Sequence, residues 1–240
     1  MLQNSRWKDG SIIMKHLILV AALGSIGSLS AIAGTLYPSI YYSPVINKKT
    51  MQCEESKVHQ VLDKNHNIIE TLCHQEYKQC EFQGSCIVLD GEKSKTLNFI
   101  NYDEETEQTA FALVDNRICR YGLGKKNICL DPFYSVAADL TQHKLGDVLF
   151  IPKIKGTLLP NGKIHNGFVI VRDSNQFLPR AGAGNLVFFT GNFSYEDIEN
   201  PFVKLGLSNL DNISTFRKAT KLESIKVRKQ RNYPKLNNEE

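Results

Sequence analysis

Six cysteines constrain this 240-residue chain most strongly, because all of them lie between residues 53 and 129. An even number of cysteines in an exported chain indicates disulfides, although the sequence leaves their connectivity open. Pairing of near neighbours would join Cys80 to Cys86 and Cys119 to Cys129, which leaves Cys53 for Cys73. The chain has no Cys-x-x-Cys motif and no paired histidine spacing, so we expect no metal and no cofactor.

The N-terminus has the pattern of an export signal. Lys15 and His16 precede an apolar run over residues 17–28, and Ala31-Ile-Ala33 supplies the small-x-small pattern of a cleavage site. The apolar run is shorter than the roughly 20 residues that a membrane-spanning helix needs. We therefore expect residues 1–33 to be a signal peptide cleaved after Ala33, in a periplasmic or secreted protein without a transmembrane segment in its mature chain. Because Met14 opens this signal directly, residues 1–13 are expected to be an over-extended start.

The remaining chain divides into two regions of different character. Residues 34–130 hold short β-prone stretches without a long helical period, which predicts a disulfide-stapled, β-rich region. Three apolar runs follow over residues 148–152, 168–171 and 186–189, and Gly, Pro and Asn turns separate them. Short strands at such spacing predict a small β-barrel over residues 131–215. The expected fold class is mainly β.

Positive charge gathers at the C-terminal end. Residues 216–240 hold eight basic residues against three acidic ones, in a chain whose net charge is +4. This basic tail is expected to be a solvated surface helix or strand, with contact to anionic wall polymers or phospholipids as the alternative. We expect no nucleic-acid partner and a monomeric chain.

Short motifs between residues 129 and 191 resemble one known family. Cys129-Leu-Asp-Pro-Phe-Tyr-Ser-Val-Ala-Ala-Asp139 is followed by Gly146-Asp-Val-Leu-Phe-Ile-Pro152, Val171-Arg-Asp173 and Phe188-Phe-Thr-Gly191. This order resembles the three-aspartate (3D) domain of membrane-bound lytic transglycosylase A and of small secreted cell-wall proteins. The resemblance implies a six-stranded double-psi β-barrel. It also implies cleavage of peptidoglycan strands between N-acetylmuramic acid and N-acetylglucosamine, to 1,6-anhydro products, by an aspartate acid/base.

The resemblance carries over to individual residues only in part. Asp139 matches the first family aspartate and Asp173 the second, which implies that Asp173 is the acid/base and that Asp139 orients it or raises its pKa. The third aspartate is replaced by Val187, and Asn175 and Gln176 stand at the family's glycine pair.

Three alternatives concern single residues. Asp139 could instead cap a turn through backbone amides, and Asp173 could be a turn former before Ser174-Asn175. His165 and Asn166 are candidates for substrate contact, although His165 also fits a solvent-exposed loop.

Two functions therefore remain open from the sequence. The first is a lytic transglycosylase acting on peptidoglycan glycan strands. The second is a non-catalytic relative that binds peptidoglycan or a wall protein without cleavage, which Val187 and the missing glycines favour.

Overall fold

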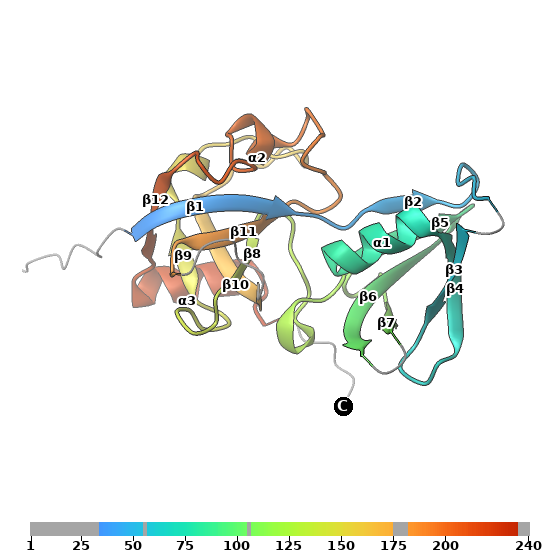
Figure 1. Cartoon of the computed structure of the whole chain (residues 1–240). Coiled ribbons are helices and arrows are strands. Elements are labelled where there is room, and N and C mark those ends of the chain that lie inside the picture. The colour runs from blue at the N-terminus through green and yellow to red at the C-terminus, as the bar shows by residue number, and fades with distance from the viewer. Residues whose placement is uncertain (1–33, 55–56, 105–106, 175–181, 235–240) are drawn as a thin grey trace, which may run out of the picture. The chain divides into compact units, whose positions relative to one another are not determined.

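The computed structural model describes residues 34–54, 57–104, 107–174 and 182–234, all within one compact unit that spans residues 31–240. The described residues form a closed barrel and a separate six-stranded sheet (Figure 1). The expected signal peptide and its cleavage position lie outside the described residues. Among those described, no helix combines the length and apolar character needed to cross a bilayer.

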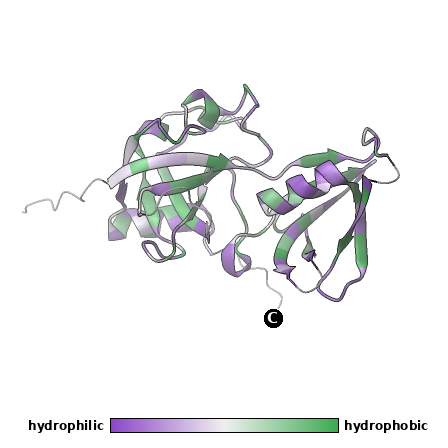
Figure 2. Cartoon of the chain, in the orientation of Figure 1, coloured by the Kyte–Doolittle hydropathy of each residue, from purple (hydrophilic) through white to green (hydrophobic). Residues whose placement is uncertain are grey.

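The closed barrel has six strands, and this part of the predicted fold is confirmed. Its strand order is β1-β11-β8-β10-β9-β12. Two strand pairs are parallel, β1 with β11 and β8 with β10, and the others are antiparallel. The strands are β1 (Gly34–Tyr41), β8 (Ser135–Ala138), β9 (Val148–Phe150), β10 (Phe168–Ser174), β11 (Asn185–Phe189) and β12 (Ser214–Lys218). Figure 2 shows hydrophobic, green segments on the barrel strands behind β1, whereas most of β1 itself is pale.

The alternation of side chains along the strands separates the inside of the barrel from its outer face. Val136 and Ala138 of β8, Val169 and Val171 of β10, and Leu186 and Phe188 of β11 pack together as the buried core. The residues between them on these strands therefore face outward. Two of those outward positions, Ala137 and Val187, matter for the candidate site below.

The first barrel strand comes from outside the segment that the sequence assigned to the barrel. The sequence analysis assigned β1 to the disulfide-stapled region, yet it pairs with β11 on one side and with β12 on the other. Leu36 and Ile40 of β1 pack into the barrel core, while Tyr41 belongs to the opposite face of the strand. The barrel therefore draws on residues 34–41 as well as on residues 135–218.

The second sheet carries the cysteine-rich region and confirms its β-rich character. Its order is β2-β5-β6-β7-β3-β4, formed by β2 (Val45–Asn47), β3 (Val58–Leu62), β4 (Ile68–Cys73), β5 (Ser85–Asp90), β6 (Lys93–Asp103) and β7 (Gln108–Val114). Leu72, Val88, Leu97 and Phe111 lie in its buried core. The three disulfides join Cys53 to Cys73, Cys80 to Cys86 and Cys119 to Cys129, which is the pairing favoured from the sequence.

One helix in this region was missed by the sequence analysis. Helix α1 (His74–Gln83) lies in the region that the sequence analysis predicted to be β-rich. It is short and polar, and only Tyr77 and Cys80 of its residues are buried. A single i, i+3 pair gives too little apolar periodicity to reveal a helix. Gly84 ends it in the left-handed conformation, with φ of 79°, that favours glycine.

Four short helical segments accompany the barrel strands in the described part of the chain after residue 119. They are the 3₁₀ turns η2 (Lys125–Asn127) and η3 (Pro152–Ile154), and the helices α2 (Pro201–Lys204) and α3 (Lys221–Gln230). Val227 of α3 packs on Val148 and Ile170, which are outward-facing residues of β9 and β10. Of the predicted basic tail over residues 216–240, residues 216–218 belong to the barrel strand β12, and residues 221–230 form the surface helix α3.

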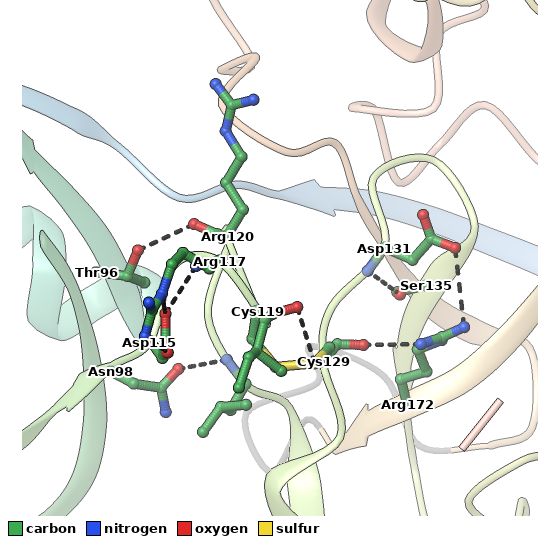
Figure 3. Close-up of a disulfide and its surroundings, with 12 residues drawn as sticks. Thr96, Asn98, Asp115, Arg117, Cys119, Arg120, Cys129, Asp131, Ser135 and Arg172 are labelled. Atoms are coloured by element: carbon green, nitrogen blue, oxygen red, sulfur yellow. Dashed lines mark hydrogen bonds and ion pairs between the residues drawn. A yellow bond between two sulfur atoms is a disulfide. The ribbon is translucent and has the colours of Figure 1, made fainter. Parts of the chain in front are cut away.

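A fully buried arginine lies on β10, directly before Asp173. One guanidinium nitrogen of Arg172 donates to the Cys129 carbonyl at 2.8 Å, and the other donates to the Arg231 carbonyl at 3.1 Å. The Asp131 carboxylate lies 3.8 Å from the same guanidinium (Figure 3). Asp131 in turn accepts hydrogen bonds from Nε and one terminal nitrogen of the Arg231 guanidinium. Arg172 therefore connects β10 to the disulfide-bonded Cys129 and to the C-terminal segment.

We predict that Arg172→Ala lowers the free energy of unfolding by about 3–5 kcal/mol, because it leaves the buried Cys129 carbonyl without a donor, removes the bond to the Arg231 carbonyl and opens a cavity. The matched control is Arg117→Ala, since the exposed Arg117 pairs only with Asp115 at the surface. This control should leave stability unchanged within error. Urea denaturation of the two variants measures the contrast, and equal effects would contradict it.

Candidate functional site

Four barrel strands align a row of outward-facing residues around Asp173. In the strand register, Asp173 of β10 is opposite Ala137 of β8, Ala137 is opposite Val187 of β11, and Val187 is opposite Ser39 of β1. The register shifts between Val171 and Asp173, so Arg172 sits at an irregularity of the strand. The shift aligns Asp173 with outward-facing residues of its neighbours instead of with the core.

The Asp173 carboxyl is half-buried, and burial raises its pKa to about 6. The Ser174 N–H donates to Oδ1 at 2.8 Å, and the Tyr41 hydroxyl donates to Oδ2 at 3.3 Å. These bonds, with the backbone and charge of Lys125, favour the carboxylate and limit the rise. The group consequently exchanges its proton near neutral pH, which is the property required of an acid/base.

Tyr41 is the residue of this site that the sequence analysis missed. Its ring lies 5.0 Å from that of Phe189, and burial together with the neighbouring Asp173 raises the pKa of its hydroxyl well above 10. The hydroxyl therefore stays a hydrogen-bond donor throughout the physiological range. The alternation of Leu36, Pro38 and Ile40 with more polar residues would have indicated a half-buried strand leading to Tyr41.

Asp139 caps a turn at the end of β8. Its Oδ1 accepts from the Thr141 N–H at 2.8 Å, and its carbonyl accepts from the His143 N–H. The bond from Thr141 is also the main reason why the pKa of Asp139 is lowered. The turn-capping alternative thus describes its contacts. The pKa of Asp173 is raised mainly by burial, and not by a neighbouring carboxylate such as that of Asp139. A catalytic role for Asp139 stays a prediction.

His165 is a core residue, which corrects both expectations made for it. Only 1% of it is exposed, so it can neither contact a substrate nor act as a surface loop histidine. Its Nε2 bonds to the Phe133 carbonyl at 2.9 Å, and the Gly167 N–H donates to its Nδ1 at 2.9 Å. It stacks on Tyr134 with 4.5 Å between ring centroids. Burial lowers its pKa to about 4, so the imidazole is neutral and structural.

Asn166 is exposed, and its side chain accepts from the Phe168 N–H at the start of β10. Asp173 lies near the other end of the same strand. At about 3.3 Å per residue, a strand of this length separates the two by roughly 20 Å. Contact of Asn166 with a substrate stays a prediction, and it would concern a part of that substrate far from Asp173.

Val187 is the residue that the sequence resemblance aligned with the family's third aspartate. It faces outward two strands from Asp173, at about 10 Å between backbones, and is only 7% exposed. An apolar side chain therefore lies on the same face of the barrel as Asp173, two strands away. Asn175 and Gln176, at the family's glycine pair, lie outside the described residues. Among those described, no group of three His, Cys, Asp or Glu side chains is placed to hold a metal.

No family model and no curated protein matches this sequence. Solved structures do match. MltA of Escherichia coli with bound chitohexaose is 12% identical, with 78% of this chain and 73% of that chain covered and a TM-score of 0.48. A membrane-bound lytic murein transglycosylase from Agrobacterium tumefaciens is 9% identical, with 80% and 75% covered and a TM-score of 0.47. The lytic transglycosylase LtgG of Burkholderia pseudomallei is 13% identical, with 78% and 71% covered and a TM-score of 0.41.

The chain distantly resembles the MltA lytic transglycosylases in structure. At these identities and scores, the likeness assigns no activity and no residue role to this chain.

Asp173 and His165 are expected to give opposite pH dependences of stability. The pKa of Asp173 is raised from 3.8 to about 6, so its ionisation costs about 3 kcal/mol of stability above pH 6, and this cost disappears as the pH falls towards 4. The pKa of His165 is lowered from 6.5 to about 4, so its contribution is complete above pH 6.5 and is lost as the pH falls.

We predict that Asp173→Asn stabilises the protein at pH 7 by about 1–3 kcal/mol and has little effect at pH 4. The variant should therefore lose stability more steeply than the wild type between pH 6.5 and 4, because the His165 contribution is no longer offset. Urea denaturation across this range measures both curves. Parallel curves would contradict the raised pKa.

Proposed function

We propose that this protein is an exported lytic transglycosylase of the 3D type, with peptidoglycan glycan strands as its substrate and Asp173 as its acid/base. The single observation that carries the proposal is an outward-facing carboxyl whose pKa is raised to about 6 by burial, on a closed six-stranded barrel. The motif resemblance over residues 129–191 supplies the substrate class. The three disulfides are typical of extracytoplasmic proteins and support the location in the cell envelope.

One carboxyl is sufficient for both proton transfers of this reaction. Protonated Asp173 donates its proton to the glycosidic oxygen as the bond from that oxygen to C1 of N-acetylmuramic acid breaks and an oxocarbenium-like centre develops. The Asp173 carboxylate then accepts the proton of the 6-hydroxyl on the same sugar, and O6 bonds to C1. The product is a 1,6-anhydro ring and a free 4-hydroxyl, no water is consumed, and Asp173 returns to its protonated state.

Tyr41 would orient Asp173 during this cycle. Its hydroxyl donates to Oδ2, which stabilises the carboxylate form. The bond also restricts rotation of the carboxyl group. Asp139 would contribute through the turn after β8 rather than through its charge, because its carboxylate is engaged by the Thr141 N–H.

A second candidate function is glycan binding without cleavage. Val187 favours it, because a side chain without charge or hydrogen-bonding capacity stands where the family has a carboxylate. The same face of the barrel would then hold a glycan strand in the envelope, and Asp173 would serve as a hydrogen-bonding group.

We predict that purified protein releases 1,6-anhydro muropeptides from isolated peptidoglycan, and that Asp173→Asn lowers the rate by about 10²–10⁴-fold because it removes the proton donor. Asp139→Asn is the matched control. It retains the amide oxygen that caps the turn, so it should stay within a few fold of the wild type.

Mass spectrometry of the soluble products measures both rates. Cosedimentation with insoluble peptidoglycan but no anhydro product would favour the binding function instead. A fully active Asp173→Asn variant would reject the assignment of the acid/base.

The raised pKa of Asp173 also predicts the pH profile. The protonated form is required to start the reaction, so kcat/KM should be highest below pH 6 and fall about tenfold per pH unit above it. A profile of initial rates between pH 4.5 and 8 measures this. A rate that rises through this range would contradict a protonated Asp173 as the donor.

A further inference from the structure

Helix α3 has a second apolar side that the fold does not use. Its inward side is provided by Val227, which packs on Val148 and Ile170. On the other side, Leu222 is 80% exposed and Ile225 is 57% exposed. Residues three apart on a helix lie on one face, so these two side chains form a single exposed apolar pair.

Lysines surround this apolar pair. At about 100° per residue, Lys221, Lys226 and Lys229 project from the same half of the helix as Leu222 and Ile225, and all three are exposed. Arg228 is turned away from them, because it donates to the Gly146 carbonyl. The exposed half of α3 thus combines two aliphatic side chains with three positive charges.

The single acidic residue of α3 does not reduce this charge at the surface. Glu223 accepts two hydrogen bonds from Arg217, and it also accepts from the Thr220 N–H as part of a capping box. Its own backbone N–H donates to the Thr220 hydroxyl. The helix is therefore fixed at its N-terminus and offers its basic, apolar half as a preformed surface.

We propose that this half of α3 docks the protein on an anionic phospholipid bilayer, with the helix lying in the plane of the surface. Leucine and isoleucine would enter the boundary between headgroups and acyl chains, and the lysine ammonium groups would remain among the lipid phosphates. Charge complementarity selects an anionic membrane, because three lysines attract acidic headgroups that a neutral bilayer lacks. The exposed Leu222 and Ile225 favour a bilayer over a soluble polyanion, because binding of a polyanion would require only the lysine charges.

The test is cosedimentation of residues 31–240 with vesicles of phosphatidylglycerol and phosphatidylcholine, and with vesicles of phosphatidylcholine alone. We expect binding to the anionic vesicles only. Leu222→Ser/Ile225→Ser should weaken it at least tenfold, and so should Lys226→Gln/Lys229→Gln. All four side chains are on the surface, so the circular dichroism spectra and thermal unfolding of both variants should match those of the parent.

Two matched controls keep the proposal falsifiable. Leu158→Ser/Ile164→Ser removes another exposed aliphatic pair, with 63% and 61% exposure, and Lys64→Gln/Lys93→Gln removes two other exposed lysines. Both should bind the anionic vesicles like the parent. Loss of binding with the lysine variant but not with Leu222→Ser/Ile225→Ser would overturn the proposal in favour of a polyanionic wall polymer. Equal weakening by a control pair, or no binding to anionic vesicles, would also overturn it.

Discussion

The pairing of β1 with both β11 and β12 is the interaction on which the described architecture depends. Without β1, the strand order would run β11-β8-β10-β9-β12, and β1 closes the barrel by pairing with both ends of that order. A six-stranded sheet without this closure would leave two open edges and expose part of the core around Leu36. Closure also places the Tyr41 hydroxyl beside the Asp173 carboxyl, although the two residues are 132 positions apart in the chain. The candidate site is therefore a consequence of the way the barrel closes.

Asp173 owes its properties to neighbours from three separate parts of the chain. Tyr41 comes from the first strand, Ser174 from its own strand, and Lys125 from the turn enclosed by the Cys119–Cys129 disulfide. Arg172, the preceding residue, is fixed by the Cys129 carbonyl and by the C-terminal segment. These contacts hold the end of β10 in place while burial keeps the carboxyl from ionising at its ordinary pH. A shifted pKa is a feature that an acid/base requires.

Local signals in the sequence predicted several strands and the disulfide pairs. Most features that the sequence analysis did not predict depend on contacts between residues far apart in the chain. Apolar runs with Gly and Pro turns gave β9, β10 and β11, and close spacing favoured the disulfide pairs that the structure contains. The sequence could not show that residues 34–41 belong to the barrel, because the partners of β1 lie about 150–180 residues away. The burial of His165 was missed for the same reason, since the rings and the carbonyl that enclose it come from distant segments. Helix α1 was missed because its apolar period is too weak.

The pKa of the Asp173 carboxyl in the folded protein is the most direct test of this account. It can be measured by ¹³C NMR titration of side-chain carboxyl groups between pH 3 and 8, with the Asp173→Asn variant to assign the signal. The account predicts a transition near pH 6, well above the ordinary 3.8 of an aspartate. A transition at or below pH 4 would mean that Asp173 is ionised whenever a substrate arrives, and it would contradict an acid/base role.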